Sequence, residues 1–247
     1  MTPRALASNA VDLWCTTLDV PPDGMDAAWA VLSDHERWRA ARYVSQTNQR
    51  RFVVSRGMLR TLLARYTGID PCDVPVAYSP QGKPRVPMAG APEFSVSHSE
   101  DLAVYAVTRS RQVGVDIERI RPRPNSMDIA SAYFARSEIS ALLAAPAMEH
   151  TATFLACWTR KEAYLKARGE GLTVPLDSFS VSVPPEPPRL REAPSDGTAD
   201  HWQLHAVPVP PGYVGTVAVE ASRSERLVLV MRSWDARPTA RVPGGGR

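Results

Sequence analysis

The sequence predicts an α+β fold made of two similar halves. Hydrophobic residues make up 44% of the 247 residues, which is enough to build a core in one large domain or two small ones. Helical and strand patterns come in blocks, helices then strands and then both again, unlike the strict alternation of a parallel sheet. We therefore expect an N-terminal half over residues 1–112, a C-terminal half over residues 113–236 and a flexible tail over residues 237–247.

The N-terminal half begins with helical patterns and ends with strand patterns. Apolar positions predict one helix over residues 26–44 and a second over residues 48–66, which Gly68 ends. A loop rich in proline and glycine follows over residues 71–92. Three strands then come in close succession and predict an antiparallel meander: residues 94–99, 102–108 and 113–120.

The C-terminal half repeats this order. One helix is expected over residues 126–133, and a short one after an N-cap at Ser137. A longer helix is expected over residues 149–167, and Gly169 ends it. The segment 184–200 is rich in proline and polar residues and predicts a long surface loop. Four strands complete this half: residues 179–183, 202–207, 213–219 and 226–233.

Composition excludes several classes of protein. No apolar run approaches the roughly 18 residues that cross a bilayer, and residues 1–9 lack the apolar core of a secretion signal. The cysteines Cys15, Cys72 and Cys157 are widely spaced, which argues against a disulfide framework or a zinc site and favours the cytoplasm. A net charge of +3 is too small to indicate nucleic-acid binding, so we expect no nucleic acid and no membrane as a partner.

Two acids, Asp116 and Glu118, stand two positions apart on a predicted strand and share one of its faces. Like charges side by side repel each other unless something positive lies between them. A solvated sheet face is one explanation of this pair. A Mg²⁺ site is the other, because Mg²⁺ prefers carboxylate oxygens.

A third acid lies on the helix expected over residues 149–167. This helix has an apolar stripe made of Phe154, Trp158 and Leu165. Glu162 falls in the middle of the stripe, and Lys161 and Lys166 flank it. Charges on an apolar stripe cost free energy unless they are paired or bind a ligand. The alternatives to a site are a capping box begun by Thr159 and a simple ion pair between Glu162 and Lys166.

Two further segments carry polar groups in unusual places. Ser97 and His98 lie on a strand that otherwise reads as buried, where adjacent residues point to opposite faces, so a Ser–His nucleophilic pair is set aside. An anion contact from His98 competes with the alternative of a core histidine. Gly82-Lys83-Pro84 reads as a turn, but it holds one of only three lysines in the chain.

These segments, in this order, resemble the 4′-phosphopantetheinyl transferases, specifically the two-lobed, surfactin-synthetase-activating (Sfp-type) group. The matching residues are Gly82-Lys83-Pro84, Ser95-Val-Ser-His98, Gly114-Val-Asp-Ile-Glu118 and the long motif from Trp158 to Leu172 with Lys161, Glu162, Ala163, Lys166, Gly169 and Gly171. Ser95 departs from the family, which often has asparagine there.

The resemblance implies a pseudo-dimer of two α+β halves with coenzyme A bound in the cleft between them. It implies transfer of the 4′-phosphopantetheine group from coenzyme A to a serine hydroxyl of an apo acyl or peptidyl carrier protein. The by-product is adenosine 3′,5′-bisphosphate. Such a reaction needs the phosphate charge neutralised and the nucleophile aligned, with little covalent work by the protein.

The resemblance also implies roles for the charged residues. Asp116, Glu118 and Glu162 are expected to hold Mg²⁺, with Mn²⁺ as a substitute, and Glu162 is also the candidate general base. Lys166 is expected to contact the pyrophosphate as a catalytic group, with Lys161 nearby as a further coenzyme A contact.

The nucleotide end of coenzyme A is assigned to the first two motifs. Lys83, Pro84, Ser97 and His98 are expected to bind the nucleotide and its 3′-phosphate, with help from arginines within residues 50–65. An arginine-rich rim would suit a carrier protein with an acidic docking helix.

Two other functions stay open on the residues alone. One is a non-catalytic protein that binds coenzyme A or a nucleotide, although the presence of all three acids disfavours a degenerate site. The other is a Mg²⁺-dependent phosphodiesterase or nuclease, which the absence of a basic and aromatic nucleic-acid surface disfavours.

Overall fold

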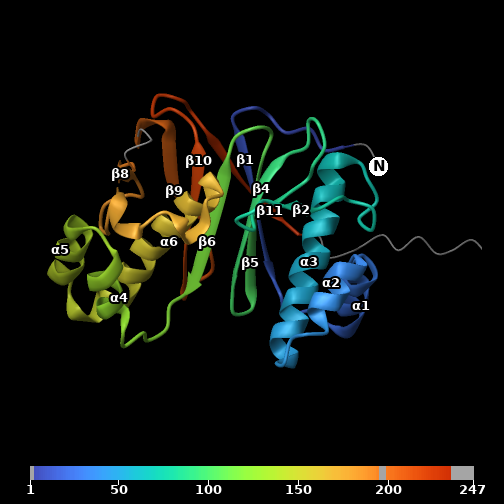
Figure 1. Cartoon of the computed structure of the whole chain (residues 1–247), viewed down its shortest axis with the longest axis horizontal. Helices are drawn as coiled ribbons and strands as arrows, with labels where there is room; N and C mark the ends of the chain where they lie inside the picture. The colour runs from blue at the N-terminus through green and yellow to red at the C-terminus, as the bar shows by residue number, and fades with distance from the viewer. Residues whose placement is uncertain (1–2, 195–198, 235–247) are drawn as a thin grey trace, which may run out of the picture.

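The computed structural model describes residues 3–194 and 199–234, and two sheets stand at its centre with helices on their outer sides (Figure 1). The strands of these sheets are β1 (Ala10–Thr17), β4 (Glu93–Ser99), β5 (Leu102–Thr108), β6 (Val113–Arg119), β9 (Trp202–Ala206), β10 (Tyr213–Glu220) and β11 (Val228–Ser233). Two short hairpins add β2 (Ala77–Tyr78) with β3 (Pro84–Arg85), and β7 (Ser180–Val181) with β8 (Leu190–Glu192).

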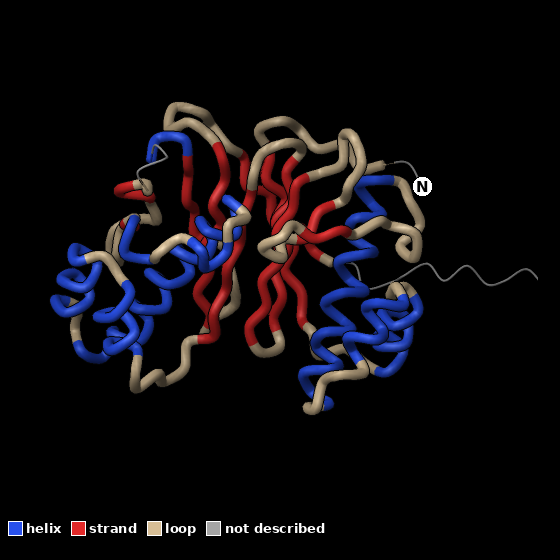
Figure 2. The backbone as a smooth tube through the Cα atoms, viewed as in Figure 1, coloured by secondary structure: helices blue, strands red, loops and turns tan. Residues whose placement is uncertain are grey.

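The helices gather on the two flanks of the molecule (Figure 2). They are α1 (Pro22–Ala30), α2 (Asp34–Ala40), α3 (Gln46–Thr67), α4 (Ser126–Tyr133), α5 (Arg136–Ala144) and α6 (His150–Arg168). The first sheet has the strand order β11-β1-β5-β4, and the second has the order β6-β10-β9. Strand β11 runs parallel to β1, whereas the other pairs run antiparallel throughout the described residues. The predicted α+β fold with two halves is confirmed.

The helical segment before α3 differs from the prediction of one helix over residues 26–44. Two helices stand there, because Ser33 opens a new one with a capping box. Its hydroxyl accepts from the backbone N–H of Glu36 at 3.3 Å, and the Glu36 carboxylate accepts from the Ser33 N–H at 3.0 Å. The next helix is confirmed within two residues at its start: α3 begins after the N-cap Ser45 and ends at Gly68, whose φ is 75°.

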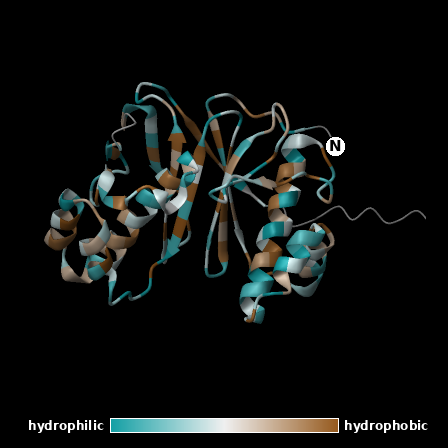
Figure 3. Ribbon diagram, in the orientation of Figure 1, coloured by the Kyte–Doolittle hydropathy of each residue, from teal (hydrophilic) through white to brown (hydrophobic). Residues whose placement is uncertain are grey.

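Hydrophobic residues lie both on the strands and on the helices that pack against the sheets (Figure 3). In the N-terminal half, Leu59 and Leu62 of α3 belong to one buried cluster with Phe94 and Tyr105 of the sheet. In the C-terminal half, α6 supplies Phe154, Tyr164 and other side chains to a second cluster. Burial of these apolar groups is the main stabilising contribution in each half.

Helix α6 lies directly against strand β6, and Gly114 makes this possible. A Cβ atom at Gly114 would stand 2.0 Å from the carbonyl oxygen of Ala163 and 2.2 Å from the backbone nitrogen of Ala167. No side chain fits in that space, so residue 114 has to be glycine while the helix stays there. The glycine therefore sets how closely the helix approaches the strand that bears Asp116.

The two sheets meet edge to edge, at β4 and β6. These strands share no backbone ladder. Instead, hydroxyls on alternate residues of β4 accept from backbone N–H groups on alternate residues of β6. The three bonds run from Val115 to Ser95 at 3.1 Å, from Ile117 to Ser97 at 3.3 Å and from Arg119 to Ser99 at 3.0 Å. We call these bonds the serine ladder.

The predicted antiparallel meander is therefore half wrong. Strands β4 and β5 form the expected hairpin, with Phe94 opposite Val107. The third strand, β6, leaves that sheet and pairs with β10, where Val113 stands opposite Val219. Strand β10, about a hundred residues further along the chain, is the backbone partner of β6. The serine ladder provides acceptors for the N–H groups on the other edge of β6.

The first sheet contains two strands that the sequence analysis did not place in it. Strand β1 was missed, and β11, predicted in the C-terminal half, pairs with β1 instead. The buried carboxylate of Asp12 holds this pair, since it accepts from Arg232 at 3.0 Å, from Arg4 at 3.2 Å and from the Tyr66 hydroxyl at 2.7 Å. The boundary at residue 112 stays a prediction. Strand β11 comes after this boundary in the sequence but belongs to the sheet of the N-terminal half.

Smaller differences concern the C-terminal half. Helix α5 follows the N-cap Ala135 rather than Ser137, because the Glu138 carboxylate accepts from the Ala135 N–H at 2.9 Å. The loop expected over residues 184–200 contains strand β8, and residues 195–198 of it lie outside the described part, as does the predicted tail. Within residues 3–194 and 199–234, none of the helices is both long and apolar enough to cross a membrane.

Candidate functional site

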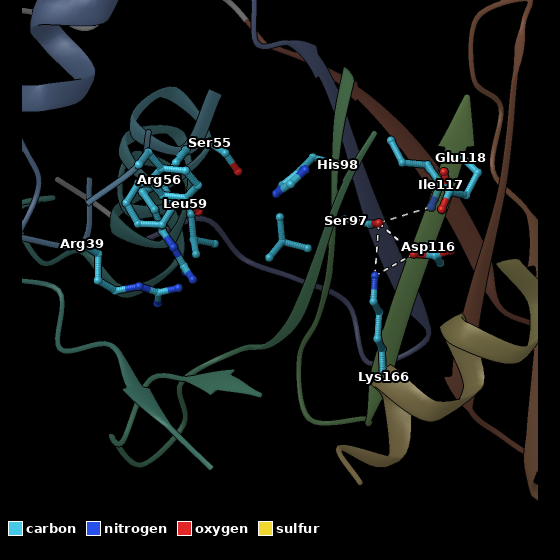
Figure 4. A pocket seen from close by; sticks show the side chains of 13 residues that line it. Arg39, Ser55, Arg56, Leu59, Ser97, His98, Asp116, Ile117, Glu118 and Lys166 are labelled. Carbon is cyan, nitrogen blue, oxygen red and sulfur yellow. Dashed lines mark hydrogen bonds and ion pairs between the residues drawn. The ribbon is translucent and has the colours of Figure 1, made fainter. Parts of the chain in front are cut away.

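A cleft of about 290 Å³ lies where the two halves meet (Figure 4). Helices α2 and α3 form one wall, and β4, β6 and the end of α6 form the other. The basic residues in its lining are Arg39, Arg56, His98 and Lys166, and the acidic ones are Asp116 and Glu118. The cleft thus brings positive groups from both halves over a pair of acids.

Asp116 stands at the centre of a hydrogen-bonded cluster that we call the inner triad: Ser97, Asp116 and Lys166. The Oδ1 atom of Asp116 accepts from the Lys166 ammonium at 2.7 Å and from the Ser97 hydroxyl at 2.9 Å. The ammonium also donates to the Ser97 hydroxyl at 3.1 Å. Ser97 also belongs to the serine ladder, so the same hydroxyl joins the two halves and orients the Asp116 carboxylate.

Glu118 repeats this arrangement two residues further along the strand, in an outer triad of Ser99, Glu118 and Arg123. Its Oε2 atom accepts from the Ser99 hydroxyl at 3.0 Å and from the Arg123 guanidinium at 2.9 Å. Each strand acid therefore has one hydroxyl from β4 and one cation from the C-terminal half.

The third acid, Glu162, is partly buried on α6. Burial raises the pKa of its carboxyl, the negative charges of Asp116 and Glu118 raise it further, and Lys166 lowers it in part. The charges of the two strand acids therefore act on Glu162. Neither the capping box nor the simple Glu162–Lys166 ion pair describes this group, since the helix is already under way at residue 150 and Lys166 bonds to Asp116.

The donors at these acids fit a hard divalent cation. The Oδ2 atom of Asp116 is buried and has no hydrogen-bond partner among the described side chains and backbone, so it is an anionic oxygen without compensation on that side. Carboxylate oxygens are the ligands that Mg²⁺ prefers. Within residues 3–194 and 199–234, no three acidic, histidine or cysteine side chains form a ready-made metal site. Asp116 and Glu118 bond instead to Lys166 and Arg123.

The opposite wall carries positive charge on an aromatic support. The guanidinium of Arg39 lies 5.3 Å from the ring centre of Phe52, and that of Arg56 lies 5.9 Å from the same ring and 5.5 Å from Tyr78. One terminal nitrogen of Arg56 is buried without a hydrogen-bond partner in the described structure. An anionic ligand would satisfy it.

His98 faces this basic wall from β4. Burial lowers the pKa of its imidazole, and the positive charges of Lys166, Arg56 and Arg51 lower it further. A ring N–H of this imidazole can donate a hydrogen bond to an anion. Sequence reasoning included Arg56 only as one of several arginines and missed Arg39, because it treated residues 26–44 as one helix and so gave no direction to that side chain.

Lys161 requires a correction. It was expected beside coenzyme A, but its side chain is 0% exposed. Its ammonium donates to both carboxylate oxygens of Glu138, at 2.7 and 2.8 Å, and to the carbonyl of Phe179 at 2.9 Å. The lysine therefore ties α6 to α5 and to the segment before β7, on the side of the helix away from the cleft.

Lys83 is also used inside the protein. Its ammonium donates to the carbonyl of Ala167 at 2.7 Å and to that of Val113 at 3.4 Å, so it caps the end of α6 beside the start of β6. Pro84 stands opposite Tyr78 in the β2–β3 hairpin. The structure does not place either residue in the lining of the cleft, and their nucleotide contact stays a prediction.

Comparisons with known proteins agree with this architecture. Residues 21–110 match the family model of the N-terminal domain of 4′-phosphopantetheinyl transferase, and residues 112–218 match that of the 4′-phosphopantetheinyl transferase superfamily. The 4′-phosphopantetheinyl transferase HetI of Nostoc sp. is 35% identical over 218 residues, which cover 87% of this chain and 89% of that protein. A putative 4′-phosphopantetheinyl transferase of Synechocystis sp. is 32% identical over 73% of each chain. Sfp of Bacillus subtilis is 32% identical over 62% of this chain and 66% of its own.

The two lysines of α6 should respond differently to substitution. Lys161→Met leaves the Glu138 carboxylate buried without its ammonium, and we expect it to lower the free energy of unfolding by about 3–5 kcal/mol. Lys166→Met removes an ion pair whose lysine is 32% exposed, so water can partly replace the ammonium, and it should cost less than Lys161→Met. Urea unfolding of both variants measures the difference, and equal losses would contradict the structural role of Lys161.

Glu162→Gln should stabilise the protein at neutral pH. The folded state raises the pKa of this carboxyl, so ionised Glu162 destabilises the fold above that pKa, and glutamine removes the charge. We expect the melting temperature to rise by about 2–4 °C for each kcal/mol gained. The gain should fade as the pH falls below the ordinary carboxyl pKa, where both side chains are neutral. A lower melting temperature at neutral pH, or a gain that ignores pH, would contradict the raised pKa.

Proposed function

The chain belongs to the 4′-phosphopantetheinyl transferases of the two-domain, Sfp type, and on that premise we propose that the cleft between its halves is where the reaction takes place. The protein transfers the 4′-phosphopantetheinyl group from coenzyme A to carrier proteins. This membership sets aside the non-catalytic binding protein and the phosphodiesterase that the residues alone left open. The observation that supports the cleft as the site is the buried, unpartnered Oδ2 atom of Asp116 below a basic wall.

The proposed reaction joins the carrier to pantetheine through a phosphodiester. A serine hydroxyl of an apo acyl or peptidyl carrier protein loses its proton while its oxygen bonds to the phosphorus that bears pantetheine. The bond from that phosphorus to the bridging oxygen breaks, and adenosine 3′,5′-bisphosphate leaves. Negative charge grows on the phosphate oxygens in the transition state, so cations fixed around them lower the barrier.

We assign the metal to the acids of the two triads. Asp116 and Glu118 are the proposed ligands of Mg²⁺, or of Mn²⁺ in its place, and Glu162 is the candidate third ligand. The metal ion would supply positive charge to the pyrophosphate oxygens. The unpartnered Asp116 oxygen supports this assignment, since an anionic oxygen buried without a donor is costly unless a cation meets it.

Glu162 is the proposed general base for the serine hydroxyl. A carboxyl with a raised pKa takes up a proton more readily than an ordinary one, which suits this role. A metal-bound carboxylate is a weaker base, so Glu162 would act as the base in the state in which it does not bind the metal directly. Lys166, one helical turn along α6, is the proposed N–H donor to the pyrophosphate.

The basic wall is the proposed site for the phosphates of the nucleotide. Arg39 and Arg56 line the cleft opposite the acids, His98 of β4 faces these arginines, and one Arg56 nitrogen lacks a partner in the described structure. Guanidinium groups bind phosphate oxygens through two parallel hydrogen bonds. The same positive charge around the cleft would favour a carrier protein with an acidic surface.

A mass-shift assay tests this function. The protein, coenzyme A and Mg²⁺ should add the phosphopantetheine mass to apo acyl or peptidyl carrier proteins. Asp116→Asn should lower kcat about 10²–10³-fold, because it removes a charge that acts on the transition state. Asp128→Asn, an exposed change on α4, is the matched control and should leave the rate unchanged.

Two outcomes would contradict the proposal. Failure to modify any of a panel of apo acyl and peptidyl carriers would contradict the activity of this chain. A wild-type rate in Asp116→Asn would leave the activity standing and contradict the placement of the site at the inner triad.

A further inference from the structure

The inner triad already contains a cation where the metal is proposed to bind. The ammonium of Lys166 lies 2.7 Å from Oδ1 of Asp116, and the other oxygen of the same carboxylate, Oδ2, is the unpartnered one. A divalent cation on this carboxylate would stand close to the ammonium. Like charges at such distances repel each other strongly in a partly buried site.

The charges of the site are nearly balanced without any metal. The site has three carboxylates, those of Asp116, Glu118 and Glu162, and two of them bond to cations of the chain, Lys166 and Arg123. A divalent ion added to this set makes the site positive. A pyrophosphate that arrives with the metal restores the charge balance of the site. Its negative oxygens also offer the Lys166 ammonium a new partner in place of Asp116.

Lys166 differs from its partners in its freedom to move. Its side chain is 32% exposed, whereas that of Asp116 is 8% exposed and fixed on strand β6. Lysine has a flexible four-carbon stem that swings a compact charge between acceptors. Ser97 does not depend on the lysine, because its hydroxyl also bonds to the N–H of Ile117 and to Asp116.

We propose that Lys166 is an internal cation that holds Asp116 in the free enzyme, and that the pyrophosphate of coenzyme A draws it away and opens the carboxylate to the metal. This proposal rests on the proposed function. It makes the metal and coenzyme A bind cooperatively, since each favours the state in which Lys166 has left Asp116. The coupling is reciprocal, so coenzyme A must bind more tightly in the presence of the metal by the same factor.

Binding of Mn²⁺ without carrier protein tests the proposal, because no turnover takes place. The affinity of the full chain for Mn²⁺ is measured by the resonance signal of the free ion, alone and with coenzyme A, after subtraction of Mn²⁺ bound by coenzyme A itself. Wild type should bind Mn²⁺ about 10-fold more tightly with coenzyme A. Adenosine 3′,5′-bisphosphate, which has no pyrophosphate, should give little of this gain.

Substitutions distinguish the effect of the Lys166 ammonium at Asp116 from the effect of the overall positive charge of the cleft. Lys166→Met should bind Mn²⁺ about 10-fold more tightly than wild type when coenzyme A is absent, and should gain less than wild type when coenzyme A is added. Lys166→Arg keeps a cation at Asp116 and should stay near wild type without coenzyme A. Arg39→Met removes one positive charge from the same cleft without touching Asp116, and it should leave the Mn²⁺ affinity measured without coenzyme A nearly unchanged.

The lysines also report the movement directly. The chain has only three, so selective labelling of lysine gives three NMR signals. Addition of coenzyme A should shift the Lys166 signal, while that of Lys161, enclosed with Glu138, stays in place.

The proposal is overturned if Lys166→Met binds Mn²⁺ no better than wild type without coenzyme A, or if Arg39→Met gains as much as Lys166→Met. An unmoved Lys166 signal in the presence of coenzyme A overturns it as well. These results would leave the mass-shift assay positive, so they are distinct from a failure of the proposed function, in which wild type modifies no carrier.

Discussion

The serine ladder between β4 and β6 is the interaction on which the rest of the structure depends. Without it, each of the two sheets would end in an open edge, with the N–H groups of Val115, Ile117 and Arg119 unpaired. Each bond contributes only about 0.5–1.5 kcal/mol, but an unpaired buried N–H costs more than that bond contributes. In the ladder the serine hydroxyls act as acceptors, so each hydroxyl can still donate its own hydrogen to another group. Ser97 and Ser99 use that capacity to orient Asp116 and Glu118.

Helix α6 carries the complementary half of the site, and its position depends on small features far from any ligand. Gly114 lets its backbone lie against β6. Lys161 holds its outer side through Glu138, and Lys83 caps its last turn. With the helix held on three sides, Lys166 bonds to Asp116, and Glu162 lies one helical turn before it on the same side of the helix. Lys83 and Lys161 thus both bond to groups inside the protein, and Lys166 is the lysine that lines the cleft.

Much of this arrangement could be predicted from local patterns. The period of two on β4 and β6 places Asp116 and Glu118 on one face, and the stripe of α6 singles out Glu162 as a charge that needs a partner. What could not be predicted depends on distant segments. Strand β6 pairs with β10, β11 returns to β1, and the direction of Lys161 is decided by Glu138 on another helix. Arg39 was missed because a capping box at Ser33 breaks the expected helix and turns the following residues toward the cleft.

Amide hydrogen exchange of strand β6 tests the central role of the serine ladder most directly. The account predicts that the N–H groups of Val115, Ile117 and Arg119 exchange slowly in the wild type, although no backbone carbonyl accepts from them in the ladder. In Ser97→Ala, the amide of Ile117 should exchange much faster than in the wild type, while the Asp116 amide, on the side of β10, keeps its protection. Fast exchange of all three amides in the wild type, or an Ile117 amide unaffected by Ser97→Ala, would contradict the account.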